Sequence, residues 1–384
     1  MDLTPDQRAL RDSVDRFIRA EIAPRISAME KAREVPREVM ERCAELGLVG
    51  ATLPEEAGGL GLGFRDLSVL METVGYHWHS LRSLLNVANM VAALIHENAT
   101  AEQRERFLAP ALSGKARVFV AITEPNHGSD VNSIELKAED RGDHFRLNGR
   151  KLWITNGGGD FGIVLARVAD PAGGRGKLTT FLVDPKESAF EVRRVDTMIL
   201  RATQTTELTF DDTIVPRANV LGAVGGGLRN ILTTLAHGRV SVASGAVGAA
   251  QAALDITTEY ARTRRQFGRL IGEQQLVQGH LAEMVALTRA ARWLVYDAAV
   301  RLDRGETARL ETSLAKRQAT EWAHRVAHLA LQLHGGIGYS EDLPIERIFR
   351  DTRGGTIPEG TSEIQSLVIG RELLGLDAFN AAKP

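Results

Sequence analysis

The chain has 384 residues, 43% of them hydrophobic, and its 47 Lys and Arg side chains nearly balance 49 Asp and Glu, giving a formal charge of -2. This length allows two or three domains of about 150 residues each, and the near-zero charge excludes the strongly basic field of a protein that binds nucleic acid or an anionic membrane. The single Cys43 excludes an internal disulfide and a thiolate metal cluster. No uncharged apolar stretch reaches about 18 residues and no signal peptide precedes the first helical pattern, so we expect a protein without a membrane span. We expect a bacterial cytoplasmic protein, and a matrix enzyme whose presequence has been removed is the alternative.

The first predicted domain, residues 1–114, is helical. Between Leu3 and about Gly114 apolar residues recur every three or four positions, which is the spacing of a helix with one buried face. Prolines and the glycine run from Gly58 to Gly63 interrupt this pattern. The sequence therefore predicts several helices separated by short loops.

The second predicted domain, residues 115–221, is a β domain. The segments HFRL and RKLWI flank Asn148-Gly149, which is the strongest short signal for a hairpin turn. The β-like segments FGIVLARV, LTTFLV and ELTF follow between turn residues. The segment AITEPNHGSD, Ala121 to Asp130, places hydroxyl groups and backbone donors on a turn-rich loop of this domain.

A glycine pattern in this domain imitates a dinucleotide fingerprint. Gly157, Gly159 and Gly162 satisfy G-x-G-x-x-G, and Asp184 follows at a suitable distance. A true fingerprint must lie between a strand and a helix, so that the pyrophosphate meets the helix N-terminus. The segment after these glycines is β-like, so we predict no dinucleotide site here.

The third predicted domain, residues 222–384, is a helix bundle. After the glycine-rich loop Gly222 to Gly227, long patterns with helical spacing return, and one of them ends at Gly335-Gly336, a typical helix stop. Histidines recur at His77 and His79 and, one helical turn apart, at His324 and His328. Neither pair has a convincing third ligand nearby, so we predict no metal site.

The segment IPEGTSEIQ near the C-terminus places a carboxylate just before a helix. Gly360 allows a left-handed backbone, and Thr361 is a suitable cap for the apolar helix that follows. Glu359 is therefore our candidate catalytic base, although a lone glutamate in a loop is more often solvated surface.

Four segments together resemble the acyl-CoA dehydrogenase family along about the whole chain: AITEPNHGSD, YARTRRQFG, QLHGGIG and IPEGTSEIQ. The resemblance implies a mainly helical α+β fold, in which a small β-barrel lies between an N-terminal helical domain and a four-helix bundle. It also implies bound FAD and the α,β-dehydrogenation of an acyl thioester, with Glu359 as the base and an electron-transfer flavoprotein as the acceptor.

The resemblance also implies roles for individual residues. Thr123, Trp153 and Thr155 would contact the flavin ring, and Arg264 would reach the pyrophosphate of a neighbouring subunit's FAD, which requires an oligomer and in the family a homotetramer. The cofactor positions implied are Thr123, Ser129, Trp153, Thr155, Arg264, Phe267, Gln332, Gly336, Thr361 and Glu363. The substrate positions implied are Arg82, Ser129, Arg239 and Gly360.

Two departures from the family pattern concern the acyl pocket. Pro358 stands where members that use this base usually have an aromatic residue, which leaves the choice of acyl group open. Gly238 occupies the position from which other members take their base, and glycine has no basic group.

The segment SLRSLL, Ser80 to Leu85, suggests a second type of substrate. It resembles acyl-carrier-protein dehydrogenases of polyketide extender-unit pathways, and its Arg82-Ser83 pair resembles the carboxylate-binding pair of glutaryl-CoA dehydrogenase. An acyl-carrier-protein substrate with a polar or carboxylated acyl group is therefore an alternative to an ordinary acyl-CoA. Arg82 as a plain surface charge is another interpretation that stays open. A flavin-free scaffolding protein on the same fold is disfavoured, because the base and cofactor positions are all present.

Overall fold

The computed structural model describes residues 2–170 and 173–379. Its first part is helical, as predicted, and α5 and α4 contribute a large share of its buried apolar side chains. Gly75 lets α4 approach the C-terminal helix α8 closely, because a Cβ at this position would lie 2.4 Å from the Gly245 carbonyl oxygen. The helices of this part are α1 (Pro5–Phe17), α2 (Ile26–Ala32), α3 (Arg37–Glu45), α4 (Phe64–His77), α5 (His79–Asn98), α6 (Ala101–Gln103) and α7 (Ala109–Leu112).

The central part is one eight-stranded sheet in which β6, β7, β3, β2, β4, β5 and β8 follow in this order, with β1 paired to β4. Phe119, Phe145 and Phe181 lie fully buried in its core. The strands are β1 (Val118–Ala121), β2 (Lys137–Asp140), β3 (His144–Thr155), β4 (Phe161–Val168), β5 (Lys177–Val183), β6 (Glu191–Arg194), β7 (Thr205–Pro216) and β8 (Val220–Leu221).

The predicted hairpin turn at Asn148-Gly149 is wrong. Strand β3 continues through both residues, and its register with β7 shifts between Leu147 and Gly149, as in a β-bulge. The Asn148 side chain accepts from the Asp212 N–H and donates to the Asp212 carboxylate, each at 2.9 Å. Asn-Gly often forms a hairpin turn, but here the two hydrogen bonds between Asn148 and Asp212 on the neighbouring strand keep the chain extended.

The glycines of the G-x-G-x-x-G pattern lie in the turn between β3 and β4 and at the start of β4, so no helix follows them. A Cβ at Gly159 would lie 2.4 Å from the Arg117 carbonyl oxygen, and a Cβ at Gly162 would lie 2.3 Å from the Phe119 ring. Close packing therefore accounts for these two glycines, in agreement with the interpretation that the pattern is accidental.

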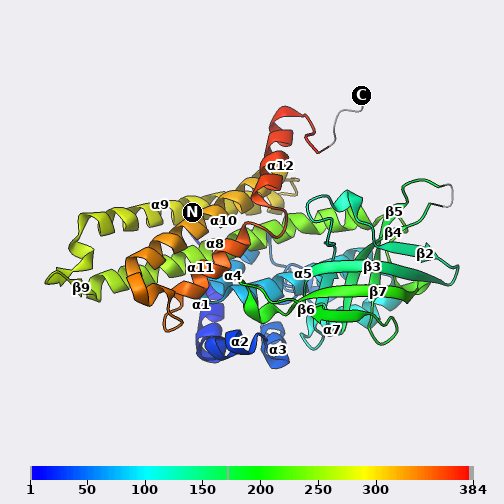
Figure 1. The fold of residues 1–384 in the computed structure, drawn as a ribbon, viewed down its shortest axis with the longest axis horizontal. Coiled ribbons are helices and arrows are strands. Elements are labelled where there is room, and N and C mark those ends of the chain that lie inside the picture. Colours follow the sequence, from blue (N-terminus) through cyan, green and yellow to red (C-terminus); the bar gives the residue numbers. More distant parts are fainter. Residues whose placement is uncertain (1, 171–172, 380–384) are drawn as a thin grey trace.

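The C-terminal part is a bundle in which the long helices α8, α9 and α10 run side by side, away from the sheet (Figure 1). The α10 helix ends at His334, and Gly335 takes a positive φ of 63° at its cap, as predicted. The elements are α8 (Gly227–Thr263), β9 (Arg265–Gln266), β10 (Arg269–Leu270), α9 (Gln275–Asp303), α10 (Arg309–His334), α11 (Ile345–Gly355) and α12 (Ser362–Leu374).

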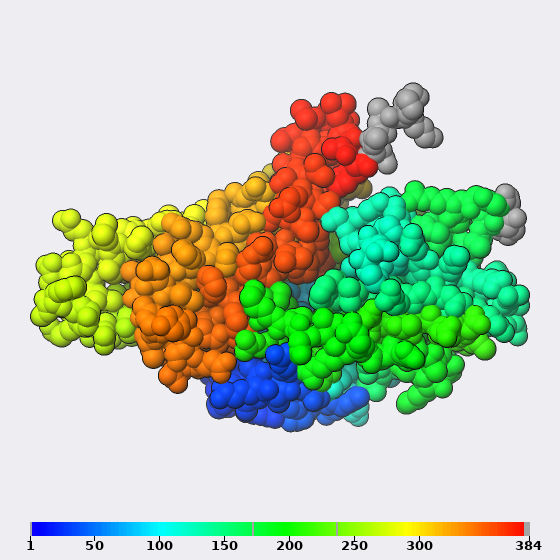
Figure 2. Space-filling model, viewed as in Figure 1, coloured from blue at the N-terminus to red at the C-terminus, as the bar shows by residue number. Residues whose placement is uncertain are grey.

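Within the described residues, α8 is the one helix long and apolar enough to cross a membrane by composition, but 83% of its most apolar window is buried inside the protein. It is thus the central core helix of the bundle. The predicted fold class, mainly helical α+β with a small β domain between two helical parts, is confirmed. Figure 2 shows α12 projecting from the body and a hollow between its start and the β domain.

Candidate active site

Glu359 lies in the short loop between α11 and α12, in a backbone conformation that non-glycine residues rarely adopt. Its φ is 58°, and that of Gly360 is 88°. Such a conformation costs about 1–3 kcal/mol at a non-glycine residue and persists only where the surroundings hold it. Here Lys316 Nζ donates to the Gly360 carbonyl at 2.7 Å, and Gln365 Nε2 donates to the Glu359 carbonyl at 3.0 Å. The loop is therefore fixed, as expected for a positioned functional side chain.

The Glu359 carboxylate is shielded from water and only partly hydrogen-bonded. Asn86 Nδ2 donates to Oε1 at 3.2 Å, while Oε2 is buried and has no partner among the described residues. Burial raises the pKa of Glu359, against the opposing effects of Arg239, the Asn86 hydrogen bond, Arg82 and Lys316. A carboxylate with a raised pKa and one free oxygen is suited to accept a proton.

Three cationic side chains surround this one carboxylate. Arg82, on α5, is 4% exposed, and among the described residues its side chain makes no hydrogen bond or ion pair. Burial lowers its pKa to about 10, and burial lowers the pKa of Lys316 to about 8. Arg239 Nη1 donates to Ser313 Oγ at 3.5 Å, and its Nε has no partner among those residues. Because three buried cations share the one Glu359 carboxylate, positive charge is in excess here, and this pocket favours a ligand that carries acceptor oxygens.

Glycines on α8 make room for these side chains. A Cβ at Gly238 would lie 2.7 Å from Glu359 Oε2, and a Cβ at Gly245 would lie 2.7 Å from Arg82 Cδ. Both distances are too short for any real side chain without a shift. The bare face of α8 therefore admits Glu359 at one level and Arg82 about two helical turns further along.

The predicted flavin-ring residues gather on the β domain. The Leu152 N–H donates to the Thr123 carbonyl at 2.9 Å, so the loop after β1, which also carries the exposed Ser129, is joined to β3 beside Trp153 and Thr155. Trp153 has a φ of 64° and leaves 57% of its surface exposed. An exposed indole held in an unusual conformation offers a flat apolar face, which fits a flavin ring.

The predicted pyrophosphate residues gather at the end of the helix bundle that lies away from the β domain. Arg264 is the residue that caps the C-terminus of α8, and Phe267, 97% exposed, lies in the β9–β10 turn. The Gln332–Gly336 segment lies nearby, because the rings of Tyr260 on α8 and His334 on α10 stack with centroids 4.3 Å apart. This end is far from the β domain in Figure 1. One chain thus does not bring the two groups together.

The two remaining cofactor positions, Thr361 and Glu363, lie close to the candidate base. Thr361 caps α12 by accepting from the Ile364 N–H, and Glu363 lies in the first turn of that helix. Gly360, a predicted substrate position, stands between Glu359 and Thr361 in the sequence. The start of α12 therefore combines predicted cofactor and substrate positions within five residues.

Sequence reasoning missed three residues that contact Glu359 or its loop: Asn86, Lys316 and Gln365. Asn86 follows Arg82 by four residues on α5, so the helical spacing was an available signal once Arg82 was considered. Lys316 and Gln365 offered no local signal, because their partners are backbone carbonyls of the 359–360 loop.

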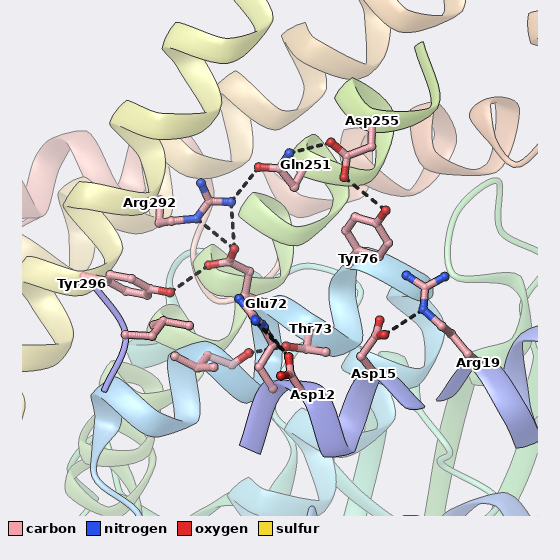
Figure 3. Close-up of a pocket in the computed structure, with 13 residues that line it drawn as sticks. Asp12, Asp15, Arg19, Glu72, Thr73, Tyr76, Gln251, Asp255, Arg292 and Tyr296 are labelled. Atoms are coloured by element: carbon pink, nitrogen blue, oxygen red, sulfur yellow. Dashed lines mark hydrogen bonds and ion pairs between the residues drawn. The ribbon is translucent and has the colours of Figure 1, made fainter. Parts of the chain in front are cut away.

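A large cavity, about 560 Å³, lies elsewhere, among α1, α4, α8 and α9 (Figure 3). Its charged side chains satisfy one another: Arg292 pairs with Glu72 at 2.9 Å, and Gln251 links Arg292 to Asp255. The cavity contains none of the residues around Glu359. We interpret it as a structural network rather than a reaction site.

The histidine pairs do not form a metal site in the part of the chain that the structure describes. His77 pairs instead with Asp15 at 2.8 Å. Residues 2–170 and 173–379 contain no group of three or more His, Cys, Asp or Glu side chains that could hold a metal ion.

Comparison with known proteins identifies the family. The N-terminal domain of acyl-CoA dehydrogenases matches residues 4–115, the middle domain matches residues 120–213, and the C-terminal domain matches residues 225–374. The chain belongs to the acyl-CoA dehydrogenase family. The family is FAD-dependent, so FAD is the cofactor, and the protein is an oxidoreductase that acts on a CH–CH bond of an acyl-CoA.

Relatives of known name match along nearly their whole length. A probable acyl-CoA dehydrogenase of Bacillus subtilis is 36% identical, with 97% of this chain and 99% of the relative covered. A caffeyl-CoA reductase–Etf complex subunit of Acetobacterium woodii is 34% identical, with 96% and 97% covered. The structure of a glutaryl-CoA dehydrogenase from Mycobacterium smegmatis superposes with a TM-score of 0.93 at 31% identity, with 98% and 97% covered. The relatives thus include both dehydrogenases and reductases by name.

Proposed function

We propose that the protein dehydrogenates an acyl thioester between its α and β carbons and that Glu359 is the base. The observation that carries this proposal is the buried Glu359 carboxylate, whose Oε2 has no partner among the described residues while Asn86 orients Oε1. Glu359 takes the α-proton, and the electrons of that C–H bond form the new double bond. FAD, when bound, supplies the acceptor for the hydride that leaves the β-carbon.

The backbone of Glu359 supports the same reaction. Within the described part of the chain, no backbone hydrogen bond uses the Glu359 N–H. It is therefore free to donate to the thioester carbonyl, where negative charge develops as the α-proton leaves. A donor placed at such an oxyanion commonly contributes a factor of about 10² or more in rate.

The second candidate function keeps this chemistry and changes the substrate to a polar or carboxylated acyl group, carried by an acyl-carrier protein. The buried and unpaired Arg82 supports the polar or carboxylated acyl group of this candidate, since a guanidinium in such surroundings is stabilised by an acyl carboxylate or hydroxyl. The similar glutaryl-CoA dehydrogenase accepts an acyl group of this kind by its name. The 4% exposure of Arg82 also supports a role inside the pocket rather than that of a plain surface charge.

We further propose a bacterial cytoplasmic homotetramer that passes electrons to an electron-transfer flavoprotein. The named relative from Acetobacterium woodii belongs to an Etf complex, which supports this acceptor. Strand β3, which carries Trp153, lies far from β9, which directly follows Arg264, and this separation supports a cofactor site completed by a second chain (Figure 1).

We expect the purified protein to be yellow and to bleach anaerobically when an acyl thioester is added. The measurement is a screen of acyl-CoAs and the matching acyl-carrier proteins, with straight, branched and carboxylated acyl groups. Faster bleaching by the carrier-protein form of one acyl group would favour the second candidate. If no thioester bleaches the bound flavin, the proposed function is wrong.

Arg264→Ala should lower both flavin retention and assembly, because a phosphate contact from a neighbouring subunit couples the two. We expect sedimentation to show dissociation at protein concentrations where the parent is oligomeric, together with a lower flavin-to-protein absorbance ratio. Arg262→Ala is the matched control, since Arg262 is exposed on the same helix end and its ion pair with Glu259 spans 4.0 Å. A flavin-loaded monomer would contradict the shared site.

A further inference from the structure

We propose that Ser241 is a specificity-determining residue whose hydroxyl binds a carboxylate at the end of the acyl group, together with Arg82. This inference rests on the proposed function and adds to it a second polar contact and a position for the acyl end group. It concerns a residue of α8 that none of the sequence motifs contains.

The position of Ser241 follows from the two glycines of α8. Gly238 lies against the Glu359 carboxylate, and Gly245 lies against the Arg82 side chain. At about 100° per residue, Ser241 lies within about 60° of both glycines around the helix axis. Its level is about 4.5 Å beyond Gly238 along the axis. Ser241 therefore stands on the same side of α8, between the base and the buried guanidinium.

The state of the Ser241 hydroxyl distinguishes it from its neighbours. Its side chain is 3% exposed, and Oγ has no hydrogen-bond partner among the described residues. The other described serines and threonines of α8 donate to carbonyls about one turn earlier, for example Ser244 to Val240 at 2.7 Å and Thr234 to Asn230 at 3.1 Å. The remaining residues of this kind are Thr233, Thr257, Thr258 and Thr263.

The unpaired hydroxyl on α8 and the unpaired guanidinium that reaches α8 from α5 form a set of donors for a carboxylate. Each group is costly when buried alone, and a carboxylate oxygen satisfies both through charge-assisted hydrogen bonds. Because Ser241 lies only one helical turn from the level of the base, the end group belongs to a short chain. The ligand class is thus a short ω-carboxyacyl thioester.

The test compares acyl-CoAs of equal chain length: succinyl with butyryl, glutaryl with valeryl, and adipyl with hexanoyl. For the preferred carboxyacyl substrate, Ser241→Ala should lower kcat/KM by about tenfold, the usual scale of a hydrogen bond to a charged group. We expect the effect to fall mainly on KM, and the straight-chain partner should change by less than about threefold. Ser244→Ala, which removes a buried hydroxyl already bonded to its own helix, should leave the preference unchanged.

Ser241→Thr keeps a hydroxyl and should retain most of the preference, which separates hydrogen bonding from packing. Equal losses for both members of each pair, or a parent without preference for the carboxyacyl member, would overturn the inference while leaving the dehydrogenase assignment intact. Failure of every thioester to bleach the parent flavin would overturn both.

Discussion

Glu359→Gln is expected to lose about 10⁴-fold in turnover while still binding FAD and thioester. Loss of a general base commonly costs about 10² to 10⁴ in rate. We expect the upper end, because Gly238, the position that the family resemblance proposes for an alternative base, has no side chain. Glutamine keeps the size of the side chain and the backbone N–H. Turnover with an artificial electron acceptor, combined with a spectral titration of thioester binding, separates lost chemistry from lost binding.

Glu372→Gln provides the matched control for this variant. Glu372 lies on the neighbouring helix α12 and pairs with the adjacent Arg371 at 3.5 Å, outside the group of residues around Glu359. It should keep the parent rate within about twofold. A Glu359 variant that no longer bound thioester would show that the carboxylate serves binding rather than proton transfer.

Gly238→Ala is expected to lower turnover by about 100-fold, the cost of moving a catalytic group by about 1 Å. The added methyl group would lie 2.7 Å from Glu359 Oε2 and 2.8 Å from Cδ, so the carboxylate must move away. Stopped-flow rates of flavin bleaching with a good substrate provide the measurement. Flavin content should stay at the parent level, because the α8 backbone is unchanged.

Gly279→Ala is the matched control, since Gly279 lies inside helix α9 and its added methyl group would meet nothing within 4 Å. Alanine at such a position should raise stability by about 0.5–1 kcal/mol through its helix propensity. Full activity of both alanine variants would contradict the placement of Glu359 against α8.

The sequence predicted those parts of the fold that depend on local chemistry. Gly335 stops α10 and Thr361 caps α12, as their residue types indicated, because each acts within one helical turn. Asn148 misled the interpretation because its role is decided by Asp212, 64 residues further on in the neighbouring strand. Local turn propensity gave way there to a cross-strand contact.

The candidate site was only partly predictable for the same reason. Glu359 was identifiable as a candidate base from its loop and from the family resemblance. Asn86 reaches Glu359 across 273 residues, and Lys316 holds Gly360 through a backbone carbonyl, which carries no sequence signature. The unpaired state of Arg82 and Ser241 is a property of packing, so only coordinates reveal it.

The most direct test of Glu359 as the base is the rate of anaerobic flavin bleaching in a single turnover, followed across pH for the parent and for Glu359→Gln. Because burial raises the pKa of Glu359, its basic form is lost on acidification at a higher pH than in an exposed glutamate. The parent rate should therefore fall with decreasing pH through a midpoint above the ordinary glutamate pKa of about 4.3. The Gln variant should be about 10⁴-fold slower, without this transition. A variant that bleached within about tenfold of the parent, or that kept the same pH transition, would show that another residue removes the proton.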